Sequence, residues 1–230
     1  MPPAQKAHGP LRSYGRIKSR ALKPRQAALL ESEGRRLMLP ELSEGPIDPK
    51  TLMPDAAEVW LEIGFGGGEH MAAQAERRPE VLILGAEPFL NGVASAVRHI
   101  EERGLGNVRL LQGDARELLA ALPDACLDRV FILFPDPWPK ARHHKRRLIQ
   151  DEVVAELART LKPGGRLRFA TDWTDYADWT LERLLRAPAF RWTAERADDW
   201  RVPPQDHITT RYESKALGDC KPVFIEAVRA

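Results

Sequence analysis

The chain has 230 residues, 43% of them hydrophobic, and a net charge of +2 at pH 7, which suits one α/β domain with a sizeable core. Because the net charge is near zero, any nucleic-acid binding would depend on where the basic residues lie. Two isolated cysteines and the lack of a long apolar run argue against a disulfide framework, a membrane anchor or a secretory signal, so we expect a cytoplasmic protein.

The first 25 residues carry seven Lys or Arg and no acid, and Pro, Gly and Ser interrupt them. Such a segment buries too little apolar surface to order itself, so it is either an arm that binds phosphate or a solvated tail. Residues 26–57 contain one short helical stretch, at 26–36, followed by four prolines. We therefore assign residues 1–57 to a basic N-terminal arm and lead-in, and residues 58–230 to one folded domain.

Residues 58–63 form a short apolar run that predicts a buried strand, and a helix is expected at 69–78. The glycines between them permit positive φ angles and remove Cβ atoms, so a ligand can lie against the backbone where the strand ends. A dinucleotide would need helix amides free of negative charge in front of its pyrophosphate, and Glu69 stands at that place.

The spacing Glu62-x-Gly64-x-Gly66-x-Gly68 instead suits a cofactor that lacks phosphate and carries positive charge. S-adenosylmethionine, with its sulfonium and α-ammonium groups, is such a cofactor. The alternative is a tight turn that only packs the strand on the helix.

Two further predicted strands, at 81–87 and 107–114, end in Glu87 and Asp114. Glu87 follows the first glycine of the loop by 23 residues, close to the interval of about 20 at which a doubly wound fold places a carboxylate on a ribose hydroxyl pair. Asp114 either contacts the cofactor or caps the next helix, as Asn91 is expected to cap the helix after Glu87. Together with the acid of the first strand, these carboxylates would line one edge of a crevice.

The fourth predicted strand, 127–134, runs into the segment Phe134-Pro135-Asp136-Pro137-Trp138-Pro139-Lys140. Three prolines in five residues make this loop stiff, so it would aim Asp136 and Trp138 at the cofactor from the switch point of the sheet. A run of cations follows on the rim and suits a polyanionic substrate better than a merely solvated face; it contains Lys140, Arg142, Lys145, Arg146 and Arg147. The two histidines within the run lack a third ligand, so we expect no metal.

The alternating pattern continues to the end of the chain without an internal repeat. A helix is expected at 148–160, a fifth strand at 166–171 and a further helix at 174–186. Two closing strands are expected at 209–213 and 222–227. The fifth strand again ends in an acid, Asp172. The pattern predicts an α/β protein with a mostly parallel, doubly wound sheet and an antiparallel closing hairpin.

Taken together, these segments resemble the bacterial tRNA (guanine-N7)-methyltransferase family, which has a class I methyltransferase, Rossmann-like fold. The Phe134–Trp138 loop followed by the cation run is specific to this family, whereas the glycine loop is shared by many methyltransferases. The matching segments are Leu61 to Gly66, Phe134 to Trp138, Lys140 to Arg147, Asp172 and Thr210 to Glu213.

The resemblance implies methyl transfer from S-adenosylmethionine to N7 of a guanine in the tRNA variable loop. It implies contacts to the cofactor or the reaction centre from Glu62, Glu87, Asp114 and Asp136, with Gly64, Gly66 and Gly68 in the cofactor loop. It implies contacts to the tRNA substrate from Lys140, Asp172, Thr210, Arg211, Tyr212 and Glu213.

Guanine N7 has an in-plane lone pair and no proton to lose, so catalysis would rest on alignment and electrostatics rather than on a general base. Asp136 is the candidate catalytic residue, and it either stabilises the positive charge that develops on the base or accepts hydrogen bonds from guanine N1 and N2. Asp172 and Glu213 are alternatives for that base-edge contact. Trp138 either stacks on a flipped guanine or packs the loop against the sheet.

Two other functions stay open at this point. One is a methyltransferase for an exocyclic amine or another RNA base, because Asp136-Pro137-Trp138 is similar to a D-P-P-Y loop, although the second proline of that loop is missing here. The other is a non-catalytic RNA-binding protein with a methyltransferase fold. Such a protein would be expected to have lost part of the cofactor pattern, and its key positions are all present: Glu62, Gly64, Gly66 and Glu87.

Overall fold

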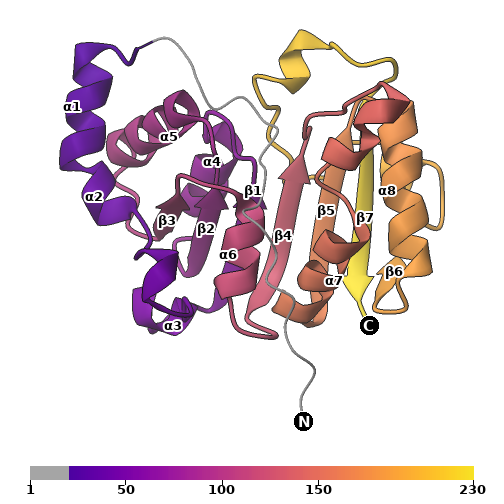
Figure 1. Cartoon of the computed structure of the whole chain (residues 1–230), viewed down its shortest axis with the longest axis horizontal. Coiled ribbons are helices and arrows are strands. Elements are labelled where there is room, and N and C mark those ends of the chain that lie inside the picture. The colour runs from indigo at the N-terminus through magenta and orange to yellow at the C-terminus, as the bar shows by residue number, and fades with distance from the viewer. Residues whose placement is uncertain (1–20) are drawn as a thin grey trace.

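The computed structural model describes residues 21–230, so the first 20 residues of the predicted basic arm lie outside the described range. Within it, a seven-stranded sheet has the order β3-β2-β1-β4-β5-β7-β6, and helices cover both faces (Figure 1). The strands are β1 Glu58–Ile63, β2 Val81–Ala86, β3 Val108–Leu111, β4 Leu127–Leu133, β5 Leu161–Thr171, β6 Phe190–Trp192 and β7 Val223–Arg229.

The strands from β3 to β5 pair in parallel, whereas β7 runs antiparallel to both β5 and β6. This arrangement confirms the predicted α/β fold, with a mostly parallel, doubly wound sheet and an antiparallel end. The chain order reverses between β1 and β4, which are neighbours in the sheet. A crevice at the carboxyl ends of these two strands is therefore the expected ligand site.

Helices connect the parallel strands, because two parallel neighbours need a crossover connection. The α-helices are α1 Pro24–Ser32, α2 Gly34–Leu37, α3 Pro49–Leu52, α4 Glu69–Arg77, α5 Leu90–Glu102, α6 Ala115–Ala121, α7 Asp151–Thr160, α8 Thr174–Arg186 and α9 Asp198–Arg201. Short 3-10 helices are η1 Leu42–Glu44, η2 Ala141–Arg146 and η3 Glu213–Lys215. No helix between residues 21 and 230 is long and apolar enough to cross a membrane.

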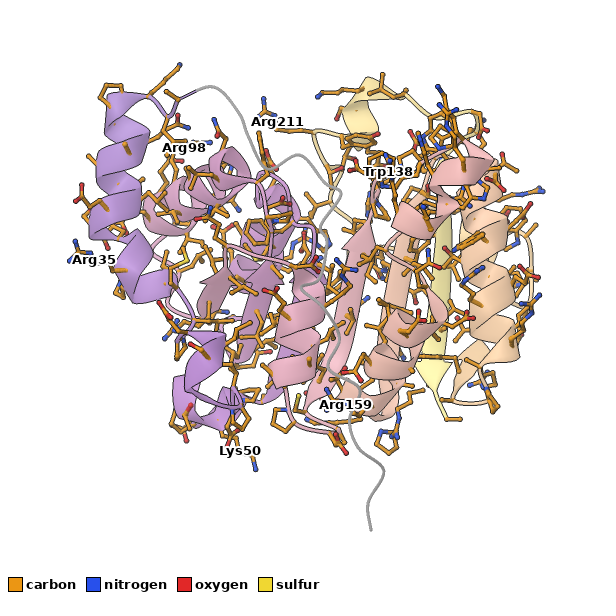
Figure 2. All side chains as sticks on the ribbon, in the orientation of Figure 1. Arg35, Lys50, Arg98, Trp138, Arg159 and Arg211 are labelled. Carbon is orange, nitrogen blue, oxygen red and sulfur yellow. The ribbon has the colours of Figure 1, made fainter. Side chains whose placement is uncertain are left out.

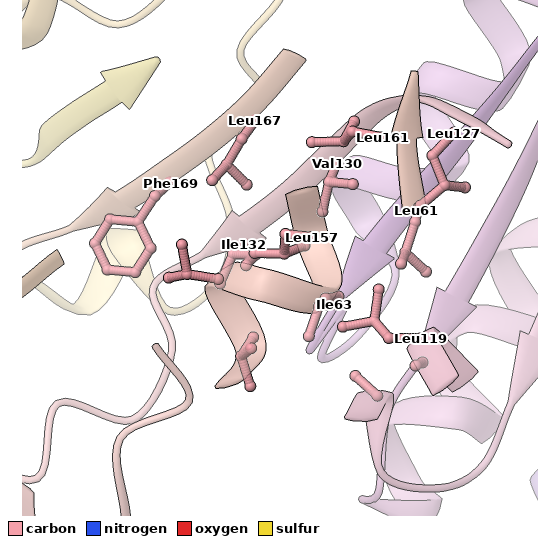
Figure 3. Packing of buried hydrophobic residues seen from close by; sticks show 14 of the residues in the cluster. Leu61, Ile63, Leu119, Leu127, Val130, Ile132, Leu157, Leu161, Leu167 and Phe169 are labelled. Carbon is pink, nitrogen blue, oxygen red and sulfur yellow. The ribbon is translucent and has the colours of Figure 1, made fainter. Parts of the chain in front are cut away.

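Alternation along each strand divides the apolar side chains between two cores, one on each face of the sheet. Leu61 of β1 enters the core beneath α6 and α7, where it joins Leu119 and Leu157 (Figure 3). Its neighbour Trp60 enters the other core, together with Met71 of α4. Because both faces of β1 are buried, the end of this strand holds its acid and the glycine loop in a fixed place.

Residues 21–57 pack on this domain. α1 lies against α5, and the Leu39 amide donates a hydrogen bond to the Leu110 carbonyl at 2.8 Å. The Ile47 amide donates to the Ala121 carbonyl at 2.9 Å. The lead-in thus follows the edge of the sheet beside β3, and the division of the chain at residue 57 stays a prediction.

The predicted strand at 209–213 is wrong. The antiparallel partner of β7 is β6, and residues 209–213 form a turn that enters η3. The physical reason is local, because the side chains of Thr210 and Glu213 each accept a hydrogen bond from the other's backbone amide, so neither amide is available to a sheet ladder. The sequence T-x-x-E signals such a capping box, so this turn was open to prediction.

Some helix boundaries also differ from the predictions. Asn91 does not cap α5, because the carbonyl of Phe89 already accepts hydrogen bonds from the first turn and the helix begins at Leu90. The helical stretch expected at 26–36 is two helices, α1 and α2, separated at Glu33. These helix boundaries do not affect β1 to β5, each of which overlaps a strand predicted from the sequence.

Candidate active site

A cavity of about 650 Å³ lies at the carboxyl ends of β1, β2 and β4, beside the glycine loop and at the switch point of the sheet. The predicted site residues that line it are Glu62, Gly64, Gly66, Glu87, Asp114, Asp136, Lys145, Arg146, Arg147, Thr210, Arg211 and Tyr212. The predicted site residues that do not line it are Gly68, Lys140, Arg142, Asp172 and Glu213.

The glycine loop contains two kinds of position. Gly64 and Gly66 have φ angles of 72° and 54°, and no atom of residues 21–230 lies within 4 Å of where a Cβ would stand, so their bare backbone faces open space. Gly68 has a φ of 81°, but its Cβ would lie 2.6 Å from the Cβ of Ala96. This third glycine therefore lets α4 pack closely on α5 instead of facing the cavity.

Glu87 holds the glycine loop in this shape. Its buried carboxylate accepts hydrogen bonds from the amides of Gly66 and Phe89, each at 2.9 Å. Burial raises the pKa of Glu87, the two amides oppose that rise, and the nearby charge of Asp136 adds to it. Since each carboxylate oxygen can accept more than one hydrogen bond, Glu87 keeps acceptor capacity toward the cavity.

Asp114 is both a helix cap and a cavity residue. Its carboxylate accepts hydrogen bonds from the Arg116 amide at 3.0 Å and from the Arg116 guanidinium Nε at 2.9 Å, at the start of α6. Burial on its own would raise the pKa of Asp114, but the hydrogen bonds and charge of Arg116 outweigh burial and lower it. The same carboxylate lines the cavity, so capping and cofactor binding are compatible at this position.

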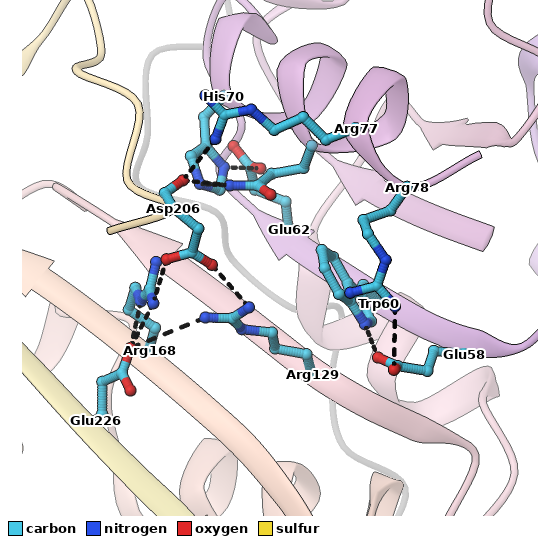
Figure 4. Close-up of polar contacts among 11 residues, drawn as sticks. Glu58, Trp60, Glu62, His70, Arg77, Arg78, Arg129, Arg168, Asp206 and Glu226 are labelled. Atoms are coloured by element: carbon cyan, nitrogen blue, oxygen red, sulfur yellow. Dashed lines mark hydrogen bonds and ion pairs between the residues drawn. The ribbon is translucent and has the colours of Figure 1, made fainter. Parts of the chain in front are cut away.

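Glu62, the acid of β1, is oriented from inside the protein. Only 3% of the residue is exposed, and its Oε2 atom lies 2.6 Å from Nδ1 of His70 on α4 (Figure 4). The Nε2 atom of His70 is in turn 3.2 Å from Nε2 of Gln74. This carboxylate therefore reaches the cavity with its direction set by buried partners.

The loop after β4 has an unusual backbone. Phe134 and Trp138 have φ angles of 51° and 44°, which residues other than glycine rarely adopt. The Nε of Arg147 donates a hydrogen bond to the Pro137 carbonyl at 2.9 Å and fastens the loop from below. Between these points, Asp136 lines the cavity without a hydrogen bond or ion pair to the described part of the chain, and burial raises its pKa.

Arg147 was expected among the cations that grip the substrate, but its side chain is only 1% exposed. Its guanidinium pairs with Asp175 and lies over the rings of Tyr176 and Trp179, at 4.9 and 5.0 Å. A buried guanidinium whose donors are engaged is not available to a phosphate. In this structure Arg147 anchors the Asp136 loop instead.

The rest of the cation run lies on and beside η2. Arg146 stacks over the Trp138 ring at 4.9 Å, and His143 meets that ring edge-on at 5.9 Å. These contacts favour a packing role for Trp138 over stacking on a flipped base. The exposed cations of the run are Lys140, Arg142 and Lys145.

Thr210 and Glu213 form a capping box at the start of η3. Thr210 Oγ1 accepts from the Glu213 amide at 3.1 Å, and Glu213 Oε2 accepts from the Thr210 amide at 3.3 Å. The two residues between them, Arg211 and Tyr212, line the cavity. The Arg211 side chain is 78% exposed, and Figure 2 shows it at the same end of the molecule as Trp138.

Asp172 lies near Tyr212 although it does not line the cavity. It is 3% exposed, and its Oδ2 accepts a hydrogen bond from the Gly218 amide at 2.9 Å. Its Oδ1 has no hydrogen-bond partner among the described residues. Burial raises the pKa of Tyr212, and the charges of Asp172 and Asp136 raise it further, so these three groups share one neighbourhood.

The sequence analysis did not single out Arg116 or Gln150, and both line the cavity. Gln150 donates hydrogen bonds to the carbonyls of His144 and Arg147, at 2.8 and 3.0 Å, and so ties η2 to the start of α7. For Arg116, the one sequence feature that could have indicated a place on the cavity is its closeness to Asp114. The position of Gln150 depends on packing between elements, which leaves no local pattern.

These residues fit S-adenosylmethionine. The carboxylate of Glu69 lies over Gly67, because a Cβ built on Gly67 would be 2.5 Å from Glu69 Oε2. The first turn of α4 therefore presents negative charge and is not an anion site. The open backbone at Gly64 and Gly66 leaves room for a ligand against the chain. Four of the acids that line the cavity were predicted to contact the cofactor or the reaction centre, and carboxylates suit sulfonium, ammonium and hydroxyl groups: Glu62, Glu87, Asp114 and Asp136.

Comparison with known proteins assigns the family. The family model described as "Putative methyltransferase" matches residues 56–225. A tRNA (guanine-N(7)-)-methyltransferase of Caulobacter vibrioides (strain NA1000 / CB15N) is 64% identical over 227 residues, which cover 98% of each chain. The protein of the same description from Hyphomonas neptunium is 53% identical over 216 residues, covering 94% of this chain and 98% of its own.

Solved structures with low sequence identity share the fold. The 16S rRNA methyltransferase KamB has a TM-score of 0.56 at 16% identity, over 79% of this chain and 92% of its own. A mutant 16S rRNA (adenine(1408)-N(1))-methyltransferase from Catenulisporales acidiphilia, solved with S-adenosylmethionine, has a TM-score of 0.56 at 18% identity, over 80% and 92%. This likeness shows the class I methyltransferase fold, and the full-length similarity to the curated relatives shows that the chain belongs to the tRNA (guanine-N(7)-)-methyltransferase family.

Proposed function

We propose that this enzyme transfers a methyl group from S-adenosylmethionine to N7 of a guanine in the variable loop of tRNA, in the cytoplasm. The observation that carries the proposal is the position of Asp136, a carboxylate with no partner among residues 21–230, in a cavity between a bare glycine loop and exposed cations. The descriptions of the relatives support tRNA as the substrate. The two free cysteines, Cys126 and Cys220, support a reducing compartment.

On the cofactor side, the chain offers acceptors and a bare backbone. Glu87 would accept hydrogen bonds from the ribose hydroxyls, and Glu62 and Asp114 would complete the acidic wall. Gly64 and Gly66 would let the cofactor lie against the chain, because no side chain stands between. When bound, S-adenosylmethionine supplies a methyl group attached to a positively charged sulfur.

On the substrate side, Asp136 stabilises the positive charge that develops on the guanine ring as N7 becomes bonded to carbon. No proton leaves N7, so the carboxylate acts by charge and position and not as a base. No group of residues 21–230 forms a hydrogen bond or ion pair with Asp136, so within that range both of its oxygens are available for this role. Asp172 is the second acceptor for the guanine edge, because its buried Oδ1 has no partner among residues 21–230.

The tRNA backbone would meet the cations around the mouth of the cavity. Lys145 and Arg211 line the cavity and are exposed. Lys140 and Arg142 extend the same surface beyond the cavity. Thr210 and Glu213 act indirectly, because their capping box fixes the turn that presents Arg211 and Tyr212.

The test is methylation of unmodified tRNA by the purified protein with S-adenosylmethionine labelled on the methyl group. After digestion to nucleosides, we expect the label in 7-methylguanosine. The matched control is the same tRNA with 7-deazaguanosine at the variable-loop position, which lacks the N7 lone pair and should remain unlabelled. Label on another base or on an exocyclic nitrogen would contradict the proposal.

A further inference from the structure

A series of buried polar groups connects the two sides of the cavity (Figure 4). It begins at Glu62, on the cofactor wall, and ends at Asp206, in the segment that leads to Arg211 and Tyr212 on the substrate wall. Glu62 Oε2 lies 2.6 Å from His70 Nδ1, and His70 Nε2 lies 3.2 Å from Gln74 Nε2. The same amide nitrogen of Gln74 lies 2.7 Å from the backbone carbonyl oxygen of Asp206. Glu62, His70 and Gln74 are residues of which only 1 to 3% is exposed.

The direction of each hydrogen bond follows from the carbonyl of Asp206. A carbonyl oxygen only accepts, so the Gln74 atom beside it has to be the NH2 group. That NH2 group also faces His70 Nε2, which must then be the acceptor nitrogen of a neutral imidazole. The proton of His70 is consequently on Nδ1, where it is donated to Glu62. A flipped Gln74 amide would instead set its oxygen against the Asp206 carbonyl.

The segment that carries the Asp206 carbonyl is held in place by ion pairs. The carboxylate of Asp206 pairs with Arg129 of β4 and Arg168 of β5, each at 2.8 Å, and Arg168 also pairs with Glu226 of β7. Burial opposes the charge of Asp206, but the two guanidinium groups outweigh burial and lower its pKa. Three adjacent strands thus fix the segment at Asp206.

The segment fixed at Asp206 leads directly to the substrate wall. The next residue, His207, is buried, and its Nε2 lies 2.8 Å from Glu213 Oε2 of the capping box. Four residues after Asp206, the turn begins that places Arg211 and Tyr212 on the cavity. The backbone at Asp206 therefore sets both the orientation of Glu62 on the cofactor wall and the position of the turn that carries Arg211 and Tyr212 on the substrate wall.

We propose that His70 and Gln74 are positioning residues that orient the Glu62 carboxylate from the carbonyl of Asp206 and so keep the two walls of the cavity in register. His70 engages one oxygen of Glu62, Oε2, and leaves Oε1 for the cofactor. This inference rests on the proposed role of Glu62 in binding S-adenosylmethionine. His70 and Gln74 would aim this carboxylate in the way that hydrogen-bonded neighbours orient the ligands of a metal.

The buried amide of Asn107, directly before β3, contacts α4 as a purely structural group and provides a contrast. Asn107 donates from Nδ2 to the carbonyls of Ala75, Arg78 and Val81, at 3.1, 3.0 and 2.9 Å, and fastens the end of α4 to the sheet. It does not line the cavity. Asn107→Leu is therefore a matched control, because it removes a buried amide from the same neighbourhood without touching the series of polar groups from Glu62 to Asp206.

The first measurement is the tautomer of His70 in the wild-type protein, read from its ring ¹⁵N shifts and assigned by the loss of the signal in His70→Asn. We expect the neutral form with the proton on Nδ1, and the same form in Asn107→Leu. A proton on Nε2 in the wild type would overturn the proposal, whether or not any variant folds. In Gln74→Glu the side chain only accepts, so we expect the proton to appear on Nε2.

The second measurement is S-adenosylmethionine affinity without tRNA, by calorimetry. Loss of a hydrogen bond to a charged group predicts affinity about tenfold weaker in His70→Leu and Gln74→Leu. His70→Asn keeps a donor near Nδ1 and should recover most of that loss. Asn107→Leu should lose stability at wild-type affinity. Unchanged affinity in folded Gln74→Leu would contradict the proposal. Methylation of another base by the wild type would refute the proposed function alone, since this affinity is measured without tRNA.

Discussion

Asp136 differs from the other three predicted cofactor-site acids because it has no partner among residues 21–230. Glu62, Glu87 and Asp114 are each bonded to neighbouring groups, so part of their charge is already compensated. Asp136 makes no hydrogen bond or ion pair with the described chain, and burial raises its pKa. An uncompensated carboxylate on the cavity is suited to respond to positive charge that appears only during the reaction.

Asp136→Asn should lower the rate constant of methylation about 100-fold, the scale for losing one preorganised electrostatic partner. Because the pKa of Asp136 is raised, the wild-type rate should fall with acidification at a higher pH than an ordinary aspartate of pKa about 3.9 would produce. The asparagine variant should lack that limb. Single-turnover rates across pH test both points, and wild-type rates in the variant would remove Asp136 from the mechanism.

The same raised pKa has a consequence for stability. An acid whose pKa is higher in the folded than in the unfolded protein costs folding free energy above its unfolded pKa, and this cost disappears as pH falls below that value. Asp136→Asn should therefore unfold at higher urea concentration than the wild type at pH 7, and the advantage should shrink on acidification.

Arg147 shows how position in space divides residues that the sequence presents alike. It follows Arg146 in an unbroken basic run, yet one guanidinium stacks on Trp138 near the cavity and the other is buried beneath the loop. Residue type indicated phosphate binding for both. Their burial, which depends on how α8 packs under the loop through Tyr176, separates them.

At the scale of elements, the glycine loop depends on how α5 begins. A Cβ on Gly92, in the first turn of α5, would lie 2.3 Å from the carbonyl oxygen of Gly66. That oxygen belongs to backbone and cannot swing aside. The first turn of α5 therefore supports the loop from behind, and the packing of this helix sets the shape of the cofactor wall.

Gly92→Ala should weaken S-adenosylmethionine binding even though alanine favours a helix over glycine by about 1 kcal/mol. Overpacking costs about 1–3 kcal/mol, and the displaced atom belongs to the loop, so we expect about tenfold lower affinity. Gly106→Ala is the matched control, because no described atom lies within 4 Å of its Cβ position and its φ is not in the left-handed region. Equal affinities in the two variants would show that α5 does not shape the loop.

For the whole molecule, the distribution of charge matters more than its total of +2. The exposed cations Lys145 and Arg211 gather where the strands end in acids, so the rim attracts phosphate while the floor attracts a cationic cofactor. Figure 2 shows Lys50 at the opposite end of the molecule from Trp138 and Arg211. One end of the sheet therefore serves both ligands.

Lys145→Gln should weaken tRNA binding and reduce the slope of log affinity against log salt by about one, because one phosphate contact is lost. Lys50→Gln removes the same charge from an exposed site at the far end and should leave the slope unchanged. Affinities measured from low to high salt decide this. The same slope for Lys145→Gln and the wild type would assign Lys145 to solvated surface.

The sequence by itself determined the order of the elements, the parallel sheet and the acids at the strand ends, because buried strands, glycine turns and helix faces leave local patterns. It also indicated the Asp136 loop. The strand predicted at 209–213 is instead a turn with a capping box at Thr210, although the T-x-x-E spacing of that box is a local signal.

Only the tertiary structure decided which members of a pattern act together. Burial of Arg147, the packing role of Gly68 and the bonding of Gln74 to Asp206, 132 residues later, all depend on contacts between elements distant in the sequence. Such contacts have no spacing rule, because they are set by how helices and loops pack over a finished sheet. The sequence thus indicated the cofactor and the substrate, and the fold decided how the chain holds each residue that would meet them.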